Sequence, residues 1–220
     1  MAVYTKYFLP WLIDLAMKNK EASRLRAEWV SRAHGEVLEI GSGSGLNLPF
    51  YSRQVHRLYG IDPSVELQRM AAKKASSVPF EVTLLPQSAE ERIQIADSSI
   101  DTIVMTWSLC SIPNPAAALQ QMRRALKPDG QMIFIEHGRS PDAGVVAWQD
   151  RITPLWKRFT GGCHLNRNVD DLMQAAGFRI SEQRNFYLPG PRPMTYTYQG
   201  IASRNPEWVV LNGTASCDRA

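Results

Sequence analysis

The chain has 220 residues, of which 44% are apolar and 21% charged, values typical of a folded protein rather than of a disordered or fibrous chain. Lys and Arg exceed Asp and Glu by 25 to 21, far from the clustered charge of a nucleic-acid-binding arm, so we expect no nucleic-acid partner. The length fits one domain with a small appendage. Three cysteines without a CxxC pair predict neither a disulfide framework nor a metal site, and they favour a reducing compartment.

The N-terminal segment is apolar but short. Residues 7–17, YFLPWLIDLAM, fall below the ~20 residues of a membrane-spanning helix, and the pattern of a signal peptide is missing, so we expect a cytoplasmic protein. Two interpretations of this segment stay open: a helix packed on its own domain, or a weak peripheral contact with a membrane surface. Helical spacing continues to Trp29 and is broken at Gly35, which predicts an N-terminal helical lid over residues 1–34.

Strands and helices then alternate along the chain. The predicted strands are residues 36–40, 55–61, 80–84, 100–106 and 131–137, and the predicted helices are residues 65–75, behind Ser64 as N-cap, and 115–126, which ends in a turn at residues 127–130. Strands separated by helical patterns form βαβ units. The pattern therefore predicts an α/β fold with a doubly wound, mostly parallel sheet.

In the last third of the chain, strand and helix patterns no longer alternate regularly. Pro, Gly and aromatic residues between 138 and 168 predict a small inserted cap. A helix over residues 170–176 follows, and then strands over residues 178–187 and 194–202, which can pair antiparallel across a Pro-rich turn. We expect the main domain to span residues 35–204, with a C-terminal tail over residues 205–220.

The strongest motif is VLEIGSGSG, residues 37–45, at the end of the first strand. Such a turn brings the backbone close to a ligand at the carboxyl edge of the sheet. The glycine spacing is GxGxG, and Leu46 stands where a dinucleotide-binding loop has its third glycine. Glu39 is unfavourable beside a pyrophosphate but suits a cationic ammonium group. Both features disfavour a nicotinamide-dependent oxidoreductase.

Two further motifs follow the next strands. Asp62 ends the second strand, where a carboxylate can accept hydrogen bonds from both hydroxyls of a ribose. The polar turn QSAEE, residues 87–91, follows the third strand. It can contact an adenine edge or be an ordinary exposed loop.

Two more motifs follow: ADSSIDTIVMTWSLC at residues 96–110 and LKPDGQMIFIEHG at residues 126–138. Together, the motifs resemble the successive signatures of class I S-adenosylmethionine-dependent methyltransferases. The resemblance implies a Rossmann-like, seven-stranded sheet with a C-terminal antiparallel hairpin and S-adenosyl-L-methionine as cofactor. It also implies that Glu39 and the glycine loop face the methionine part, that Asp62 binds the ribose and that the turn at Ser88 flanks the adenine. The implied cofactor-binding residues are Glu39, Gly41, Ser42, Gly43, Gly45, Asp62, Pro63, Ser88, Ala89, Glu90 and Thr106.

A narrower similarity concerns the acceptor. Four short stretches are similar to a subgroup with microsomal alkyl-thiol methyltransferases and small bacterial relatives. They are GLNLPFY at 45–51, SLCSI at 108–112, EHG at 136–138 and GGCHLNR at 161–167. This implies a small, fairly apolar acceptor, with a thiol ahead of an amine, hydroxyl or carbon. A phospholipid or small-amine N-methyltransferase is the alternative enzyme, and an S-adenosylmethionine-binding regulator is the alternative that does not turn over.

Methyl transfer from a sulfonium is an in-line displacement that depends on alignment, and a thiol acceptor also needs help to lose its proton. His137, at the carboxyl edge, and His164, in the cap, are the candidate catalytic residues; His137 could equally hold the cap. Arg167 could pair an acceptor anion or bond to Asp170 or Asp171, and Cys163 could be a packed cap residue. The predicted acceptor pocket comprises Tyr4, Tyr7, Trp107, Trp148, Trp156, Cys163 and Arg167.

Overall fold

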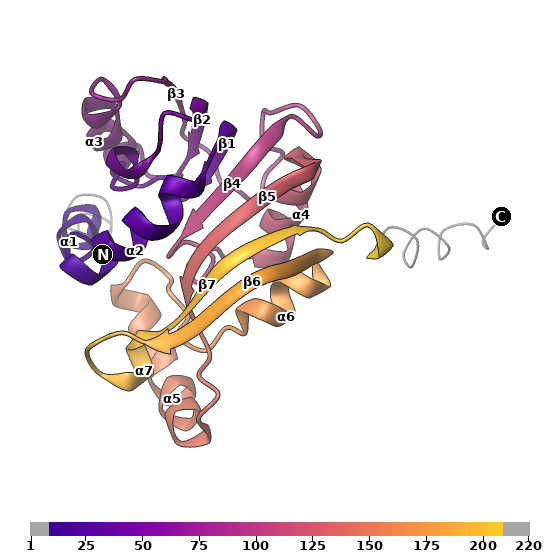
Figure 1. Ribbon diagram of the computed structural model, residues 1–220. Coiled ribbons are helices and arrows are strands. Elements are labelled where there is room, and N and C mark those ends of the chain that lie inside the picture. The colour runs from indigo at the N-terminus through magenta and orange to yellow at the C-terminus, as the bar shows by residue number, and fades with distance from the viewer. Residues whose placement is uncertain (1–8, 209–220) are drawn as a thin grey trace.

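A computed structural model of the protein describes residues 9–208, with side chains from residue 11 onward. Its centre is a seven-stranded sheet of order β3-β2-β1-β4-β5-β7-β6 (Figure 1). The strands are β1 (Gly35–Ile40), β2 (Val55–Ile61), β3 (Glu81–Leu85), β4 (Ile100–Thr106), β5 (Leu126–His137), β6 (Phe178–Tyr187) and β7 (Tyr196–Arg204). Strands β1 to β5 are parallel, and β7 pairs antiparallel with β5 and β6. The predicted doubly wound sheet with its antiparallel C-terminal hairpin is confirmed.

Helices cover the two faces of this sheet. They are α1 (Leu9–Ala16), α2 (Lys20–Trp29), α3 (Val65–Ala75), α4 (Pro115–Ala125), α5 (Ala143–Phe159), α6 (Val169–Ala175) and the single turn α7 (Arg192–Thr195), with 3-10 turns at Val30–Arg32 and Leu48–Phe50. Side-chain caps explain where two of them begin. Ser64 accepts a hydrogen bond from Leu67 N at α3, and Asn114 accepts one from Ala117 N at α4.

The core consists of two apolar layers because strand residues alternate between the faces of the sheet. Leu38 and Phe134 belong to the layer that α4 and α6 cover. Val37 and Ile135 belong to the layer on the other face, together with Leu25 of α2. Helix α2 is therefore part of the same core as β1, although its sequence pattern set residues 1–34 apart as a lid.

The N-terminal helical pattern is interrupted between α1 and α2. Asn19 begins α2, and its side chain accepts a hydrogen bond from Ala22 N at 2.8 Å. In the described side chains of α1, Asp14 is buried, whereas the large apolar side chains are exposed. These exposed residues are Trp11, Leu12, Ile13 and Leu15.

The turn predicted at residues 127–130 is instead part of β5. Ile100 pairs with Leu126, and Thr102 pairs with Gln131. Between these two pairs β4 has only Asp101, whereas β5 has residues 127–130, and the extra residues form a bulge. A Cβ at Gly130 would lie 2.6 Å from Leu126 Cδ1 and 3.0 Å from the carbonyl oxygen of Asp101. The absence of a side chain at Gly130 lets the bulge pack against β4.

The predicted cap, residues 138–168, contains α5 and a loop that returns to the sheet. Helix α5 lies beyond the carboxyl ends of β4 and β5 (Figure 1). The loop anchors itself through buried Cys163 and Leu165, which pack with Cys110. Within the described range, no helix is both long and apolar enough to span a membrane.

The described part of the predicted tail packs on the domain. Asn205 N donates to the carbonyl oxygen of Gly177 at 2.8 Å. The Trp208 ring lies under the Arg123 guanidinium, 4.6 Å from its centroid.

Candidate functional site

The glycine loop after β1 is shaped by three left-handed residues. Gly41, Gly43 and Gly45 have φ of 68°, 52° and 74°. A Cβ at Gly41 would lie 2.5 Å from Ser108 Cβ, and one at Gly45 2.8 Å from Leu48 Cδ1, whereas at Gly43 the nearest atom is 3.8 Å away. The base of the loop is therefore packed and its tip faces open space, as a ligand cradle requires. Nearby, Ser42 Oγ is buried without a hydrogen-bond partner among the described residues.

This loop lies where the order of the sheet reverses. Strand β1 has β2 on one side and β4 on the other, with the later strands continuing beyond β4. In open α/β sheets, ligands bind outside the carboxyl ends of the strands at this switch point. We therefore take the ends of β1, β2 and β4 as the candidate cofactor site.

Asp62 is held against the loop at the end of β2. It is 8% exposed, and its Oδ2 accepts a hydrogen bond from Gly43 N at 3.0 Å while its Oδ1 accepts one from Ser64 N at 2.8 Å. Burial raises its pKa. Each carboxylate oxygen keeps a second lone pair, which fits the predicted contact with ribose hydroxyls.

Glu39 is fully enclosed at the end of β1. Its Oε1 accepts a hydrogen bond from Asn47 Nδ2 at 2.8 Å, and its Oε2 accepts one from Tyr51 OH at 3.0 Å. Asn47 also bonds to Arg26 Nε and Thr106 Oγ1, both at 3.0 Å. Burial raises the pKa of Glu39 to about 7. The carboxylate thus organises the loop and the end of β4, while its predicted contact with the cofactor stays a prediction.

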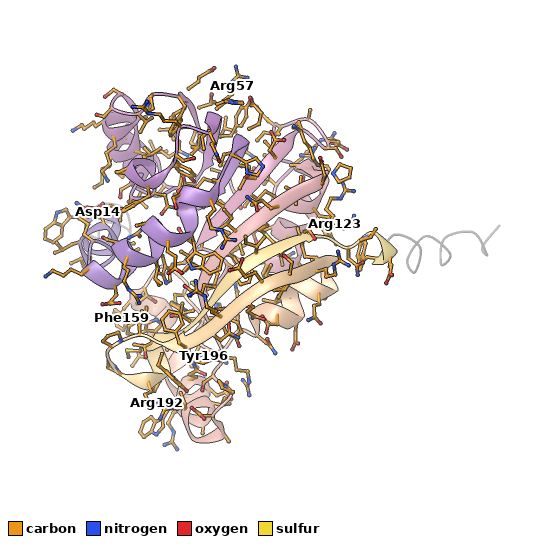
Figure 2. The ribbon with its side chains drawn as sticks, in the orientation of Figure 1. Asp14, Arg57, Arg123, Phe159, Arg192 and Tyr196 are labelled. Atoms are coloured by element: carbon orange, nitrogen blue, oxygen red, sulfur yellow. The ribbon has the colours of Figure 1, made fainter. Side chains whose placement is uncertain are left out.

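A second buried carboxylate, which the sequence analysis missed, fastens α1 to the same loop. Asp14 (labelled in Figure 2) accepts a hydrogen bond from Ser44 Oγ and pairs with Lys18 at 2.5 Å. Lys74 of α3 donates to the carbonyl oxygen of Ser44 at 2.6 Å. The available signal was a lone acidic residue inside the apolar segment YFLPWLIDLAM.

The turn predicted to flank the adenine is tied to α4. Ser88 Oγ donates to Glu90 Oε2 at 3.0 Å, and Glu90 Oε1 accepts a hydrogen bond from Asn114 N at 2.5 Å. The Ala89 side chain is buried in the core, and Pro63 is exposed beside Asp62. Contact of this turn with an adenine stays a prediction.

The chain takes a strained course after β4. Trp107 has a φ of 50°, which is uncommon for a residue with a side chain and typical of functional sites. The turn directs Ser108 N and Leu109 N to Glu136 Oε1, at 2.7 and 2.9 Å. Glu136 is completely buried, its Oε2 has no partner among the described residues, and burial raises its pKa to about 8. The EHG motif pointed to this position, but the sequence analysis selected only His137 from it.

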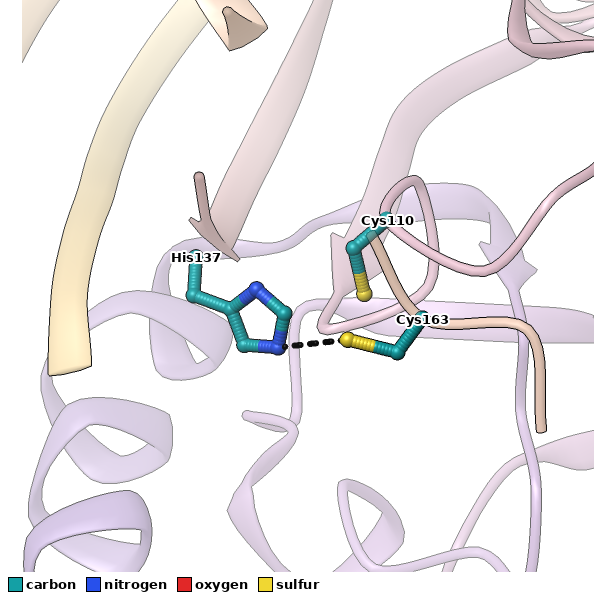
Figure 3. Close-up of side chains that lie close together, drawn as sticks. All are labelled: Cys110, His137 and Cys163. Carbon is teal, nitrogen blue, oxygen red and sulfur yellow. Dashed lines mark hydrogen bonds between the residues drawn. The ribbon is translucent and has the colours of Figure 1, made fainter. Parts of the chain in front are cut away.

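Three side chains from separate segments converge beyond this turn, Cys110, His137 and Cys163 (Figure 3). His137 Nε2 lies 3.2 Å from Cys163 Sγ, and the potential ligand atoms of all three residues lie within 4.8 Å of one another. Trp156 Nε1 donates to Cys163 Sγ at 3.4 Å. The contact with Cys163 lowers the pKa of the Cys110 thiol, and the same contact, together with burial, raises the pKa of Cys163. Burial lowers the pKa of His137, but the charge and hydrogen bond of Cys110 and the charge of Glu136 together outweigh it and raise the pKa to about 9.

Other predicted site residues have structural partners. His164 N donates to the Cys110 carbonyl oxygen at 2.8 Å, and His164 Nδ1 lies 3.3 Å from that oxygen. Arg167 donates to the carbonyl oxygens of Leu109 and Ile112, not to the expected Asp170 or Asp171. Both residues therefore hold the loop after β4 in place.

The predicted aromatic pocket is only partly assembled. Trp148 is 57% exposed and lines a separate hollow of about 660 Å³ between α5 and Arg192. It precedes Trp156 by eight helical residues, a rise of about 12 Å, and Trp156 packs against the two cysteines Cys110 and Cys163. That both tryptophans wall one acceptor pocket stays a prediction. Trp107 packs under the Arg26 guanidinium, 5.0 Å from its ring centroid. Tyr4 and Tyr7 lie outside the described residues.

Residues 15–183 match the family described as "Methyltransferase domain". The chain belongs to this family. It is 33% identical to the thiol S-methyltransferase TMT1B of Rattus norvegicus, over 70% of this chain and 64% of that protein. It is also 33% identical to a phosphatidylethanolamine N-methyltransferase of Cereibacter sphaeroides, over 76% of this chain and 81% of that protein. The fold matches a SAM-dependent methyltransferase of Aquifex aeolicus with a TM-score of 0.61 and 20% identity, covering 88% and 97% of the two chains.

Family membership identifies an S-adenosylmethionine-dependent methyltransferase, and the site fits that methyl donor. The open tip of the loop at Gly43, the unpartnered hydroxyl of Ser42 and the free lone pairs of Asp62 all lie at the switch point of the sheet. When bound, S-adenosylmethionine supplies an electrophilic methyl group on a sulfonium.

Proposed function

We propose that this methyltransferase methylates the thiol of a small, fairly apolar acceptor. One observation supports this most strongly: the cofactor loop borders, through Ser108, a segment that leads directly to the buried cluster of Cys110, His137 and Cys163. Ile152, Trp156 and Met194 supply an apolar side to its two cysteines. The thiol S-methyltransferase among the similar proteins supports the same acceptor class.

Each site residue has a role that follows from its position at the edge of the sheet. Asp62 binds the ribose at the end of β2, and the backbone of the glycine loop binds the methionine part above β1. Glu39, 1% exposed, fixes Asn47 and through it Thr106 at the end of β4. The reacting end of the donor then lies toward β4 and β5. The chain thereby supplies alignment and exclusion of water, the two requirements of an in-line displacement.

The acceptor end holds the groups that assist loss of the thiol proton. His137 is the last residue of β5, directly after buried Glu136, and its Nε2 contacts Cys163. In this structure that nitrogen is already engaged, so the sequence-based prediction of a free base at His137 needs a test. We expect His137→Ala to lower thiol methylation by at least a hundredfold and to leave donor binding within about threefold of wild type.

The experiment is turnover of S-adenosylmethionine by the full chain, with products identified by mass spectrometry on matched thiols, amines, phenols and phospholipids. Methylated thiols alone would support the proposal. His164→Gln is the matched control, because His164 contacts only the Cys110 main chain among its described hydrogen bonds. Equal loss of activity and of donor binding in both variants would show a folding defect. Turnover of amines but not thiols would contradict the proposal.

A phospholipid N-methyltransferase is the second candidate. It is favoured by the similarity to the phosphatidylethanolamine enzyme and by the exposed apolar side chains of α1, with Leu155 of α5 60% exposed as well. This candidate predicts methylated headgroups when phosphatidylethanolamine vesicles are the only acceptor. Sedimentation with vesicles distinguishes the two candidates further, since methylation of a soluble thiol does not require vesicle binding.

A further inference from the structure

Cys110, His137 and Cys163 together have the composition of a metal site. Two sulfur atoms and one imidazole nitrogen are the ligands that Zn²⁺ prefers. In a tetrahedral zinc site, neighbouring ligand atoms are roughly 3.5–3.8 Å apart, since Zn–S bonds are about 2.3 Å and Zn–N bonds about 2.0 Å. The observed separations, 3.2 Å for His137 Nε2 to Cys163 Sγ and at most 4.8 Å within the group, require shifts of only about an ångström.

The fold holds these ligands in position from three directions. Cys110 lies on the loop after β4, which Arg167 fixes through the carbonyl oxygens of Leu109 and Ile112. His137 is the last residue of β5, and its backbone pairs with Thr197 of β7. The two cysteine segments are joined by the 2.8 Å hydrogen bond from His164 N to the Cys110 carbonyl oxygen. A site assembled by separate rigid segments needs little reorganisation to bind an ion.

The surroundings provide outer-shell support and also contain unpaired polar atoms. Trp156 Nε1 donates to Cys163 Sγ, the type of hydrogen bond that stabilises a ligating thiolate. His137 Nδ1 and Glu136 Oε2 are buried without partners among the described residues.

Charge favours the same ligand. Two thiolates and a neutral imidazole around a divalent cation have no net charge, so the complex can stay buried without the desolvation penalty of an isolated ion. Cys110 and Cys163 are 3% and 5% exposed. Among the residues from 9 to 208, no further His, Cys, Asp or Glu joins this group. Three protein ligands with one position left is the arrangement of catalytic rather than structural zinc sites.

We propose that Cys110, His137 Nε2 and Cys163 bind one Zn²⁺ and that the thiol of the methyl acceptor takes the fourth coordination position. The second part rests on the proposed function. The acceptor thiol loses its proton to solvent as its sulfur binds the metal. That sulfur then forms a bond to the methyl carbon while the sulfonium S–CH₃ bond breaks, and the bonding electron pair stays on the departing sulfur. The thioether product is a weak zinc ligand and dissociates.

The first experiment measures metal binding in the full chain, independently of activity. We expect one zinc per chain by inductively coupled plasma mass spectrometry after dialysis, and thiolate-to-metal charge-transfer absorption when Co²⁺ replaces zinc. Cys110→Ser and Cys163→Ser are each expected to lose most of both signals. Cys217→Ser, which changes the remaining cysteine, outside the described residues, is the control and retains them. Absence of the cobalt absorption in the wild type overturns the proposal even if the two serine variants fail to fold.

The second experiment tests the fourth position with 1-butanethiol as the probe and 1-butanol as its control. A third thiolate is expected to increase the cobalt charge-transfer absorption by about half, and butanol is expected to leave it unchanged. Metal binding without this increase overturns the role in acceptor binding. Cobalt absorption that responds to butanethiol, with no methylated thiol formed, contradicts the proposed function but not the metal site. Full thiol methylation by metal-free protein contradicts the metal's role and leaves the proposed function in place.

Discussion

Glu39 and Asp62 are buried carboxylates at neighbouring strand ends, and burial raises the pKa of both. The pKa of Glu39 is about 7 in the folded chain against a usual value of 4.5, because burial disfavours its charged form. Between pH 4.5 and 7 the unfolded chain has therefore released a proton that the folded chain retains. The stability that Glu39 contributes is present below pH 4.5 and is lost as the pH rises through 7.

Glu39→Gln is expected to abolish this pH dependence. Relative to the variant, the wild type should lose about 2.5 kcal/mol of unfolding free energy between pH 5 and pH 8. Thermal unfolding of both proteins across this range measures the difference, and Glu91→Gln, at an exposed position, shows the effect of removing a surface carboxylate. If the difference in melting temperature between the wild type and Glu39→Gln stays constant from pH 5 to pH 8, the prediction that a buried Glu39 titrates in this range is contradicted.

Asp62→Asn is expected to weaken donor binding by at least tenfold, because charge-assisted hydrogen bonds contribute about 1.5–3 kcal/mol. The amide keeps one acceptor oxygen, so the loop contact at Gly43 or Ser64 survives in part. Isothermal titration with S-adenosylhomocysteine measures the change. Unchanged affinity would remove Asp62 from the ribose site.

At the scale of elements, the glycine loop has a packed base and an open tip, and substitutions at these two places should differ. Gly41→Ala places a Cβ 2.5 Å from Ser108 Cβ in a left-handed conformation, so we expect a loss of about 2 kcal/mol or more in stability. Gly43→Ala meets no atom within 3.8 Å of its Cβ and should lose only about 1 kcal/mol, while donor binding falls. Urea unfolding and titration of each variant separate the two effects. Equal destabilisation in both variants would contradict this description.

At the scale of the molecule, the site joins parts of the chain that are distant in sequence. Asp14 of α1 and Lys74 of α3 both contact Ser44. Donor binding at the loop should therefore stabilise both helices. We expect S-adenosylhomocysteine at about 100 times its Kd to add about 2.7 kcal/mol of stability and about 5–10 °C to the melting temperature.

The same binding should slow amide hydrogen exchange in α1 and α3 together. Asp14→Asn is expected to remove the effect from α1 and keep it in α3, because Lys74 still donates to the Ser44 carbonyl oxygen. Protection of α1 that persists in this variant would show that α1 is coupled to the loop by another route.

The sequence by itself determined the order of the seven strands, the helices α3 and α4, the glycine loop and the carboxylate after β2. These depend on local patterns: apolar runs, caps and glycines with positive φ. It also indicated the family, since four motifs occur in the right order. What it could not determine are contacts between distant segments. Three features arise only when helix α1, the end of β5 and the loops meet at one edge of the sheet. They are the contact of Asp14 with Ser44, the contacts of Glu136 with Ser108 and Leu109, and the cluster of Cys110, His137 and Cys163. The cysteine spacing gave no sign of a metal site because its ligands come from the loop after β4, the last residue of β5 and the segment between α5 and α6, and tertiary structure alone brings these together.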